Sequence, residues 1–132
     1  MDELRELTQE IVRFRDERDW SQFHTPRQLA AALAIEAGEL QETMLWKSDR
    51  EVAEALSEPS GLAAIRSEIG DVFIYGLLLC HATDTDPADA VRTKLAQNAA
   101  KYPVRLSKGS AQKYDELART DSVVPTNETN GV

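Results

Sequence analysis

The sequence has little of what several classes of protein need. Its 132 residues contain a single cysteine, Cys80, and only two histidines. A disulfide framework and a zinc site built from cysteine and histidine ligands are therefore excluded. Cys80 directly follows three leucines, Leu77–Leu79. A buried, reduced thiol is expected there, and not a ligand or a nucleophile.

Long apolar runs and an excess of positive charge are also missing. No apolar run approaches the ~18 residues of a membrane span, and residues 1–6 lack the charged-then-apolar order of a signal peptide. We therefore expect a cytoplasmic protein with no membrane partner. The formal net charge of −8 argues against a protein that holds a nucleic acid polymer through its phosphates.

The charge that is present is unevenly distributed. Residues 91–119 hold seven lysines and arginines against Asp115 and Glu116, a balance of +5, which leaves −13 for the rest of the chain. Such a split suits a metal site beside a phosphate site, and it equally suits subunit docking or a solvated face. The length favours a single domain. We expect that domain over residues 1–119, followed by a disordered tail, 120–132, that is rich in Thr, Asn, Ser and Val.

Apolar spacing and capping signals predict an all-α fold. Thr25-Pro26-Arg27-Gln28 combines a capping residue, a proline at the first helical position and a glutamine at the third, and Ser48–Glu51 repeats the capping-box pattern, with Glu51 at the third position. Glu58–Gly61 is typical of a helix stop, and Pro103 should end the last main helix. The expected helices are 2–17, 26–46, a short one over 49–56, 62–82, and 87 to Pro103.

Two acidic pairs carry the strongest chemical signal. Glu36 and Glu39 are three residues apart on the second expected helix, and Glu68 and Asp71 are three apart on the next main helix. Each pair therefore shares one helical face, beside the most apolar segments of the chain. Grouping four carboxylates in such surroundings is costly unless cations compensate them. A divalent ion held between the two helices would do so.

The chemistry of the donors narrows the choice of ion. Oxygen ligands favour magnesium, with manganese as the alternative, over zinc or copper. Di-iron chemistry is improbable because neither pair contains the Glu-x-x-His pattern. Gly38 and Gly70, one inside each motif, cost helix stability, and close helix approach or room at the site would justify both. The competing interpretation is that the acids pair with Arg13, Arg15, Arg27 or Arg66.

Aromatic residues that could hold a base surround the acidic motifs in the sequence. Tyr75 lies four residues after Asp71 and so projects from the same helical face. Each aromatic residue taken singly is more often part of a core, and a lone histidine is more often a hydrogen bonder than a metal ligand. The candidates are Trp20, Phe23, His24, Trp46 and Tyr75.

These motifs, in this order, carry a resemblance to a known family. The sequence resembles the all-α nucleoside triphosphate pyrophosphohydrolases of the MazG-like group, and within that group it is similar to the dCTP pyrophosphatases. The resemblance covers about residues 4–115. It is carried by Glu17–Trp20, Gln22–His24, Glu36–Leu40, Trp46–Asp49, Asp71–Val72, Ile74–Tyr75, Tyr102–Val104 and Lys113–Tyr114.

The resemblance assigns roles to individual residues. It implies that Glu36, Glu39, Glu68 and Asp71 bind magnesium, that Trp20, His24, Trp46 and Tyr75 line a nucleoside pocket, and that Lys47, Asn98 and Lys101 lie near the nucleotide. Phe23 is a further candidate there. One departure concerns Ile11, nine residues before Trp20, where the dCTP-specific relatives have a histidine. Losing a polar base contact would weaken strict cytosine selectivity.

The expected activity is magnesium-dependent cleavage of a nucleoside triphosphate, dCTP or a modified dCTP, to the monophosphate and pyrophosphate. Glu39, with Glu36 beside it, would orient or deprotonate the attacking water, and Glu42 is an alternative base. The expected architecture is a four-helix bundle of the MazG-like type whose apolar faces associate into a homodimer or, as the resemblance implies, a homotetramer. The rival function is a catalytically silent nucleotide-binding or assembly module.

Overall fold

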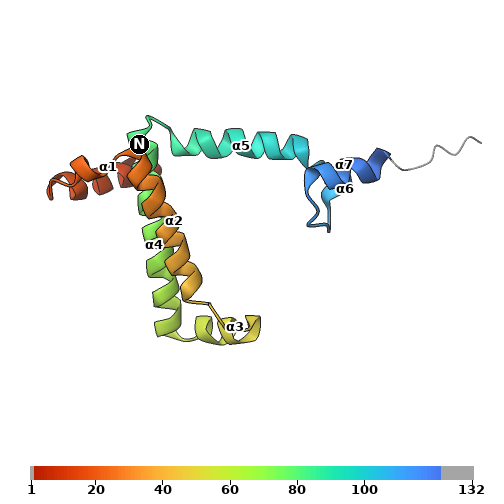
Figure 1. The fold of residues 1–132 in the computed structure, drawn as a ribbon, viewed down its shortest axis with the longest axis horizontal. Coiled ribbons are helices and arrows are strands. Elements are labelled where there is room, and N and C mark those ends of the chain that lie inside the picture. The colour runs from red at the N-terminus through yellow and green to blue at the C-terminus, as the bar shows by residue number, and fades with distance from the viewer. Residues whose placement is uncertain (1, 123–132) are drawn as a thin grey trace, which may run out of the picture. The chain divides into compact units, whose positions relative to one another are not determined.

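The computed structural model describes residues 2–122, with side chains through residue 119. Every regular element in that range is a helix, and the range contains no strand, which confirms the predicted all-α class (Figure 1). The described chain divides into two compact units at Ala88 and Asp89. The elements are α1 (Glu3–Asp16), the 3-10 turn η1 (Ser21–Phe23), α2 (Pro26–Glu42), α3 (Asp49–Ser57), α4 (Pro59–Ala82), α5 (Pro87–Lys101), α6 (Val104–Ser107) and α7 (Tyr114–Ser122).

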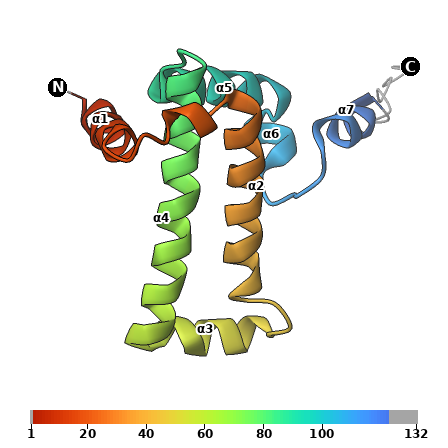
Figure 2. The same ribbon diagram turned by 60° about the vertical axis from the view of Figure 1, so that its left-hand side comes forward.

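The first unit is organised around an antiparallel pair of long helices, α2 and α4. The two pack against each other along their length, while α1 and α3 each contact α4. Figure 2 shows α3 at one end of this pair and the start of α2 at the other. The two acidic motifs therefore lie on neighbouring helices in the middle part of the pair.

Capping chemistry sets the starts of α2 and α3 where the sequence predicted them. The Thr25 hydroxyl oxygen accepts a hydrogen bond from the Gln28 N–H at 3.4 Å, and Pro26 occupies the first turn. The Ser48 hydroxyl accepts from the Glu51 N–H at 3.2 Å and donates to the Glu51 carboxylate at 3.2 Å. Each cap satisfies N–H groups that a helix start leaves without a partner.

The corner between α3 and α4 corrects one prediction. Glu58–Gly61 was expected to stop a helix, yet Pro59 opens α4 directly, with Glu58 as its N-cap residue. Proline suits this position because the first helical N–H has no intrahelical acceptor. Gly61 makes the tight corner feasible: a Cβ built there would lie 2.2 Å from the carbonyl oxygen of Ala55. Helix α4 consequently begins three residues earlier than predicted.

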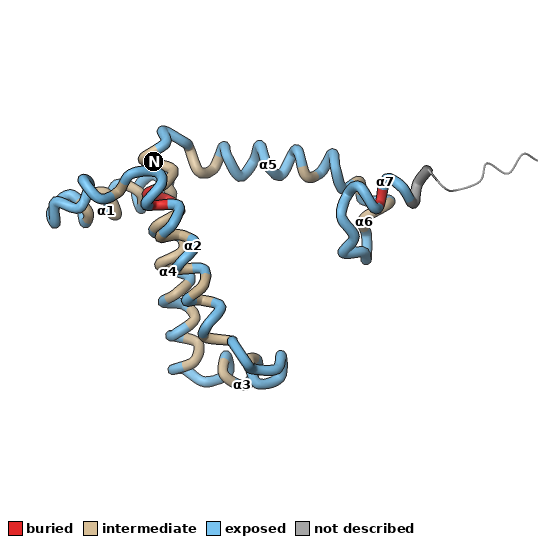
Figure 3. Tube along the Cα trace, in the orientation of Figure 1, coloured by how far each residue is buried: buried red, intermediate tan, exposed pale blue. Residues whose placement is uncertain are grey.

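The buried core of the first unit is small. Leu29 of α2 and Leu77 and Leu78 of α4 are its buried apolar residues (Figure 3). Large apolar residues elsewhere on the pair stay in water, with Ile35 at 61% exposure and Phe73 at 63%. The described part of the first unit thus leaves apolar helix surface uncovered.

The second unit forms a small cluster of its own around Leu117, which is 4% exposed. The Tyr102 and Tyr114 rings meet edge to face, with centroids 6.3 Å apart, and α6 contacts α7. Helix α7 was not predicted. It continues through Ser122, so residues 120–122 of the predicted disordered tail are helical, and the remainder, 123–132, lies outside the described residues.

Two further expectations concern the whole assembly of helices. A four-helix bundle is not confirmed: in the first unit α2 and α4 form the main pair, and α1 and α3 each pack against α4. Within residues 2–122, no helix combines the length and the apolar character required to cross a lipid bilayer.

Candidate metal centre and nucleoside pocket

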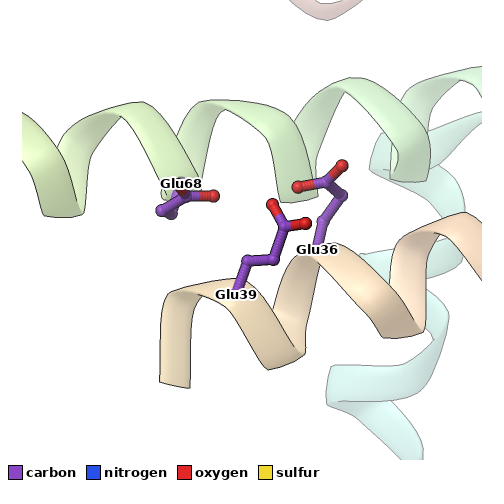
Figure 4. Close-up of side chains that lie close together, drawn as sticks. All are labelled: Glu36, Glu39 and Glu68. Atoms are coloured by element: carbon purple, nitrogen blue, oxygen red, sulfur yellow. The ribbon is translucent and has the colours of Figure 1, made fainter. Parts of the chain in front are cut away.

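Three carboxylates converge between α2 and α4. Glu36 and Glu39 project from α2 toward Glu68 on α4 (Figure 4), and each offers a ligand oxygen within 4.8 Å of the other two. Asp71, one turn further along α4, is half-buried, and its charge acts on both Glu36 and Glu68. The two pairs predicted from their spacing therefore form one electrostatic cluster, with three members in close contact.

The cluster is electrostatically unfavourable without a cation. A hydrogen bond with Glu39, followed by loss of hydration and repulsion by Glu39, Asp71 and Glu68, raises the pKa of Glu36 to about 7. Loss of hydration and the charges of Glu39, Asp71 and Glu42 raise the pKa of Glu68. One oxygen in each of Glu36 and Glu68 is buried and makes no hydrogen bond. Such oxygens are costly unless a ligand or solvent satisfies them.

These observations fit a hard divalent cation. All the donors are carboxylate oxygens, which suit magnesium or manganese, and the two unsatisfied oxygens would gain a partner. Among the ion pairs of the described side chains, none joins an arginine to any member of the cluster; Arg15, for example, contacts Asp16 at 2.8 Å. The competing interpretation, in which arginines compensate these acids, is thus unsupported.

The two motif glycines have a different role from the one expected. A Cβ built on Gly38 or Gly70 would meet no atom within 4 Å. Neither glycine therefore permits a close approach between α2 and α4 within the described chain. Close helix approach, one of the two reasons predicted for Gly38 and Gly70, is therefore wrong for the isolated chain, and open room beside the helices is the reason that remains.

A cavity of about 380 Å³ lies beside the cluster, at the end where α2 begins. Phe23, His24 and Tyr75 line it, and the His24 and Tyr75 rings meet at a 63° angle with centroids 6.4 Å apart. Burial and the nearby charge of Arg15 lower the pKa of His24, and its buried Nδ1 has no hydrogen-bond partner. The cavity thus presents aromatic surface together with a neutral imidazole.

Sequence reasoning missed several residues of this cavity. Arg27, Gln28 and Ala32 from the first turns of α2 contribute to its wall, as do Gln22 and Thr25. Thr25 and Gln28 were predicted to cap α2, and no role in a cavity was predicted for either. In the described contacts only the backbone of Gln28 takes part in the cap, which leaves its side chain at the wall of the cavity. Ile11 is half-buried on α1 and is not a wall residue.

The other predicted nucleotide contacts of the first unit are not gathered at this cavity. Trp20 packs edge-on against Phe14 of α1, with ring centroids 5.9 Å apart. Trp46 lies beyond the opposite end of α2, is 93% exposed and has a φ of 64°. Lys47, its neighbour, donates a hydrogen bond from Nζ to the carbonyl oxygen of Thr43 at 2.9 Å. Within one chain, Trp46 and Lys47 do not line the His24–Tyr75 cavity.

The remaining two candidates belong to the second unit. Asn98 is half-buried on α5, and Lys101 ends that helix. The Lys101 ammonium lies 5.0 Å from the centre of the Tyr114 ring, a cation–π geometry. Their predicted roles near the nucleotide stay predictions.

The chain is similar to proteins of one known family in sequence and in fold. Residues 31–117 match the model of the MazG-like family. The chain is 44% identical over 119 residues to dCTP pyrophosphatase 1 of Rattus norvegicus, covering 90% of this chain and 68% of that one, and 40% identical over 117 residues to dCTP pyrophosphatase 1 of Homo sapiens, covering 89% and 67%. A crystal structure of a pyrophosphatase from Archaeoglobus fulgidus superposes with a TM-score of 0.71 at 38% identity, over 78% of this chain and 94% of that one. On sequence and fold together, the chain belongs to the MazG-like family.

Proposed function

We propose that this protein is a magnesium-dependent nucleoside triphosphate pyrophosphohydrolase that converts dCTP, or a base-modified dCTP, to the monophosphate and pyrophosphate. The catalytic domain spans residues 1–119. Manganese is the expected substitute for magnesium because it accepts the same oxygen donors. The names of the relatives, dCTP pyrophosphatase 1, support the substrate class.

One observation carries the proposal. Carboxylates from two helices converge at one point with two of their buried oxygens unsatisfied, and an aromatic cavity lies next to them along the same helix pair. Tyr75 lies about one turn from Asp71, so the cavity is within reach of a sugar whose phosphates lie at the acids. A cation site for phosphates beside a pocket for a base is what a nucleotide hydrolase needs.

The chain's own residues suggest how the reaction proceeds. Glu36, Glu39 and Glu68, with Asp71 beside them, would hold magnesium, which supplies charge neutralisation of the phosphates and acidification of a coordinated water. A water oxygen forms a bond to the α-phosphorus while the bond from that phosphorus to the bridging oxygen breaks, and pyrophosphate leaves. Glu39 is exposed and hydrogen-bonded to Glu36. It accepts the water proton, and Glu36 holds Glu39 in place.

The His24–Tyr75 cavity holds the nucleoside in this proposal. The neutral His24 imidazole offers a hydrogen bond to the base, and Tyr75 and Phe23 offer aromatic surface. Ile11 lies outside the wall of the cavity and is apolar, so it offers no polar contact to the base, and selectivity for cytosine over other pyrimidines should be modest.

The working form is a homo-oligomer, either a dimer or a tetramer. Support comes from the small core and from the apolar surface that α4 leaves in water: Ile69 and Phe73, one turn apart, are 39% and 63% exposed. Exposed apolar surface of this kind is typical of association surfaces. Light scattering on a sizing column would measure the mass of the assembly.

The proposal is tested by incubating the purified protein with a panel of dNTPs, NTPs and 5-modified dCTPs and resolving monophosphate, diphosphate and pyrophosphate. We expect monophosphate plus pyrophosphate, led by cytosine deoxynucleotides and abolished by EDTA. Release of single phosphates would instead indicate a phosphatase. No turnover with magnesium or manganese would identify a silent nucleotide-binding module.

A variant separates catalysis from binding. Glu39→Gln keeps the size of the side chain but removes the proton acceptor, so we expect kcat to fall about 10²-fold or more. Glu10→Gln, on the exposed surface of α1, is the matched control and should retain activity. A folded Glu39→Gln protein that hydrolyses dCTP at the parental rate would contradict the role of Glu39.

A further inference from the structure

The start of helix α2 contributes polar side chains to the wall of the His24–Tyr75 cavity, and Gln28 is one of them. Gln28 is exposed, and the hydrogen bond that joins it to the helix cap comes from its backbone N–H, which donates to the Thr25 hydroxyl at 3.4 Å. Among the described residues, no hydrogen bond involves the Gln28 side-chain amide. Its oxygen acceptor and its two N–H donors are therefore available to a ligand in the cavity.

The equivalent side chain of helix α3 is used differently. Glu51 is the third residue of α3, as Gln28 is the third residue of α2. The Glu51 N–H donates to the Ser48 hydroxyl at 3.2 Å, and the Glu51 carboxylate accepts from the same hydroxyl at 3.2 Å. Both halves of the capping box are thus present in α3. In the described part of α2 only the backbone half is present, so the Gln28 side chain does not serve the helix start.

The register of α2 places Gln28 on the same side of the helix as the carboxylate cluster. Gln28, Ala32 and Glu36 follow one another at intervals of four residues and so share one helical face. Gln28 and Glu36 are about 12 Å apart along the helix axis. Ala32, between them, also lines the cavity, and its single methyl group leaves space there. This face therefore presents an amide, an open floor and an acid in that order.

The same order is found in a nucleotide that has its phosphates at the acids. The sugar then lies over the open floor, and the base lies towards the start of α2. The pairing edge of cytosine carries a 4-amino donor beside the N3 acceptor. A glutamine amide carries the complementary pair, an acceptor oxygen beside a donor nitrogen. When the amide is turned over, it fits thymine or uracil, whose edge carries the reverse pair.

We propose that Gln28 is a specificity-determining residue that reads the pairing edge of a pyrimidine base. Its Oε1 accepts a hydrogen bond from the 4-amino group of cytosine, and its Nε2 donates to N3. This inference rests on the proposed function, since it assigns a contact in the same nucleotide site. Because the amide can reverse, Gln28 recognises cytosine without excluding thymine. It supplies a polar base contact that the apolar Ile11 does not.

A cycle that changes the protein and the base in turn tests this contact. Gln28→Met keeps the length of the side chain and removes both polar atoms. The altered base is pyrimidin-2-one, which is cytosine without its 4-amino group. Calorimetry with magnesium measures Kd for the α,β-methylene triphosphate analogues of both deoxynucleosides, which bind without turnover. In the wild type we expect Kd to be about 3–10-fold higher for the pyrimidin-2-one analogue, as for the loss of one neutral hydrogen bond. In Gln28→Met the two analogues should bind equally well.

Gln41→Met is the matched control, because Gln41 is exposed on the same helix and does not line the cavity. It should keep the wild-type ratio of the two Kd values. A ratio that is unchanged in Gln28→Met would show that another group reads the 4-amino group, and a ratio near one in the wild type would show that no group reads it. Either result would overturn the proposal. Partial unfolding of a variant lowers the number of binding sites and leaves the ratio of the two Kd values unchanged.

Steady-state rates separate failure of this inference from failure of the proposed function. Gln28→Met should raise KM for dCTP and dTTP by similar factors and leave kcat nearly unchanged, because the contact is remote from the acids. A loss confined to dCTP would contradict the reversal of the amide. A wild-type protein that binds both analogues with the expected ratio but releases no pyrophosphate would contradict the enzyme assignment alone. One that hydrolyses dCTP and binds both analogues equally would contradict the role of Gln28 alone. Failure of both analogues to bind would contradict both proposals.

Discussion

The middle of the α2–α4 pair and its two ends differ in how closely their side chains gather within one chain. In the middle, Glu36, Glu39 and Glu68 converge within 4.8 Å from two helices of the same chain. At the ends, His24 and Tyr75 lie on one side and Trp46 on the other. The comparison teaches that the register of two packed helices is enough to gather the carboxylates, whereas the length of α2 keeps the aromatic residues at its two ends apart.

The largest effect should come from a substitution in the carboxylate cluster. Glu68→Gln removes a charge from the cluster and leaves the rest of α4 unchanged, so metal affinity and kcat should both fall, with kcat reduced about 10²-fold or more. Steady-state rates and magnesium titration monitored by calorimetry would measure both. Glu54→Gln, on the exposed surface of α3, is the control. Unchanged magnesium affinity in Glu68→Gln would show that the cluster is not the metal centre.

The second prediction compares the stability of two variants, one at a buried leucine and one at an exposed isoleucine of the same helix. Leu29 is 1% exposed, and Leu29→Ala should lower the free energy of unfolding by about 2–4 kcal/mol. Ile35 is largely exposed, so Ile35→Ala should leave the unfolding of the separated chain nearly unchanged and should weaken dimerisation. Urea unfolding at several protein concentrations distinguishes these outcomes. A loss of stability in Ile35→Ala that does not depend on protein concentration would mean that Ile35 packs within its own chain.

These regions also differ in how far the sequence could predict them. Capping residues fixed the starts of α2 and α3, because a side-chain hydrogen bond to the first turn is a local interaction. Carboxylates three apart on neighbouring apolar helices were enough to predict the cluster. Pro59 was misjudged because proline can equally end one helix or open the next. The positions of Trp46 and Lys47 relative to the cavity depend on helix length and packing, which residue type alone does not encode.

The third effect links the cluster to pH. Glu36 has a pKa of about 7 in the folded protein against 4.5 ordinarily, so between those values the folded state binds more protons than the unfolded state. Without metal, stability should therefore fall as the pH rises through this window. Magnesium competes with the proton on Glu36, so its stabilisation, about 1.4 kcal/mol at tenfold above Kd, should be present at pH 8 and largely absent at pH 5.

Thermal unfolding in magnesium chloride and in EDTA, at pH 5, 6, 7 and 8, measures this dependence. Glu36→Gln replaces the titrating carboxyl with a neutral amide and should flatten the decline in EDTA. An equal gain in Tm from magnesium at pH 5 and pH 8 would mean that proton and metal do not compete at Glu36.

The smallest effect concerns Gly38, inside the first acidic motif, and Gly61, at the corner between α3 and α4. A Cβ at Gly38 would meet no atom within 4 Å, whereas a Cβ at Gly61 would lie 2.2 Å from the Ala55 carbonyl oxygen. Gly38→Ala should therefore stabilise the separated chain by about 0.5–1 kcal/mol, since alanine favours a helix interior over glycine. Gly61→Ala should destabilise it, because the carbonyl it would strike belongs to the backbone. Urea unfolding of both variants gives the sign of each change. A Gly38→Ala protein that gains stability can still lose nucleotide affinity. That result would show that the open space beside the cluster is filled from outside the chain when the nucleotide binds.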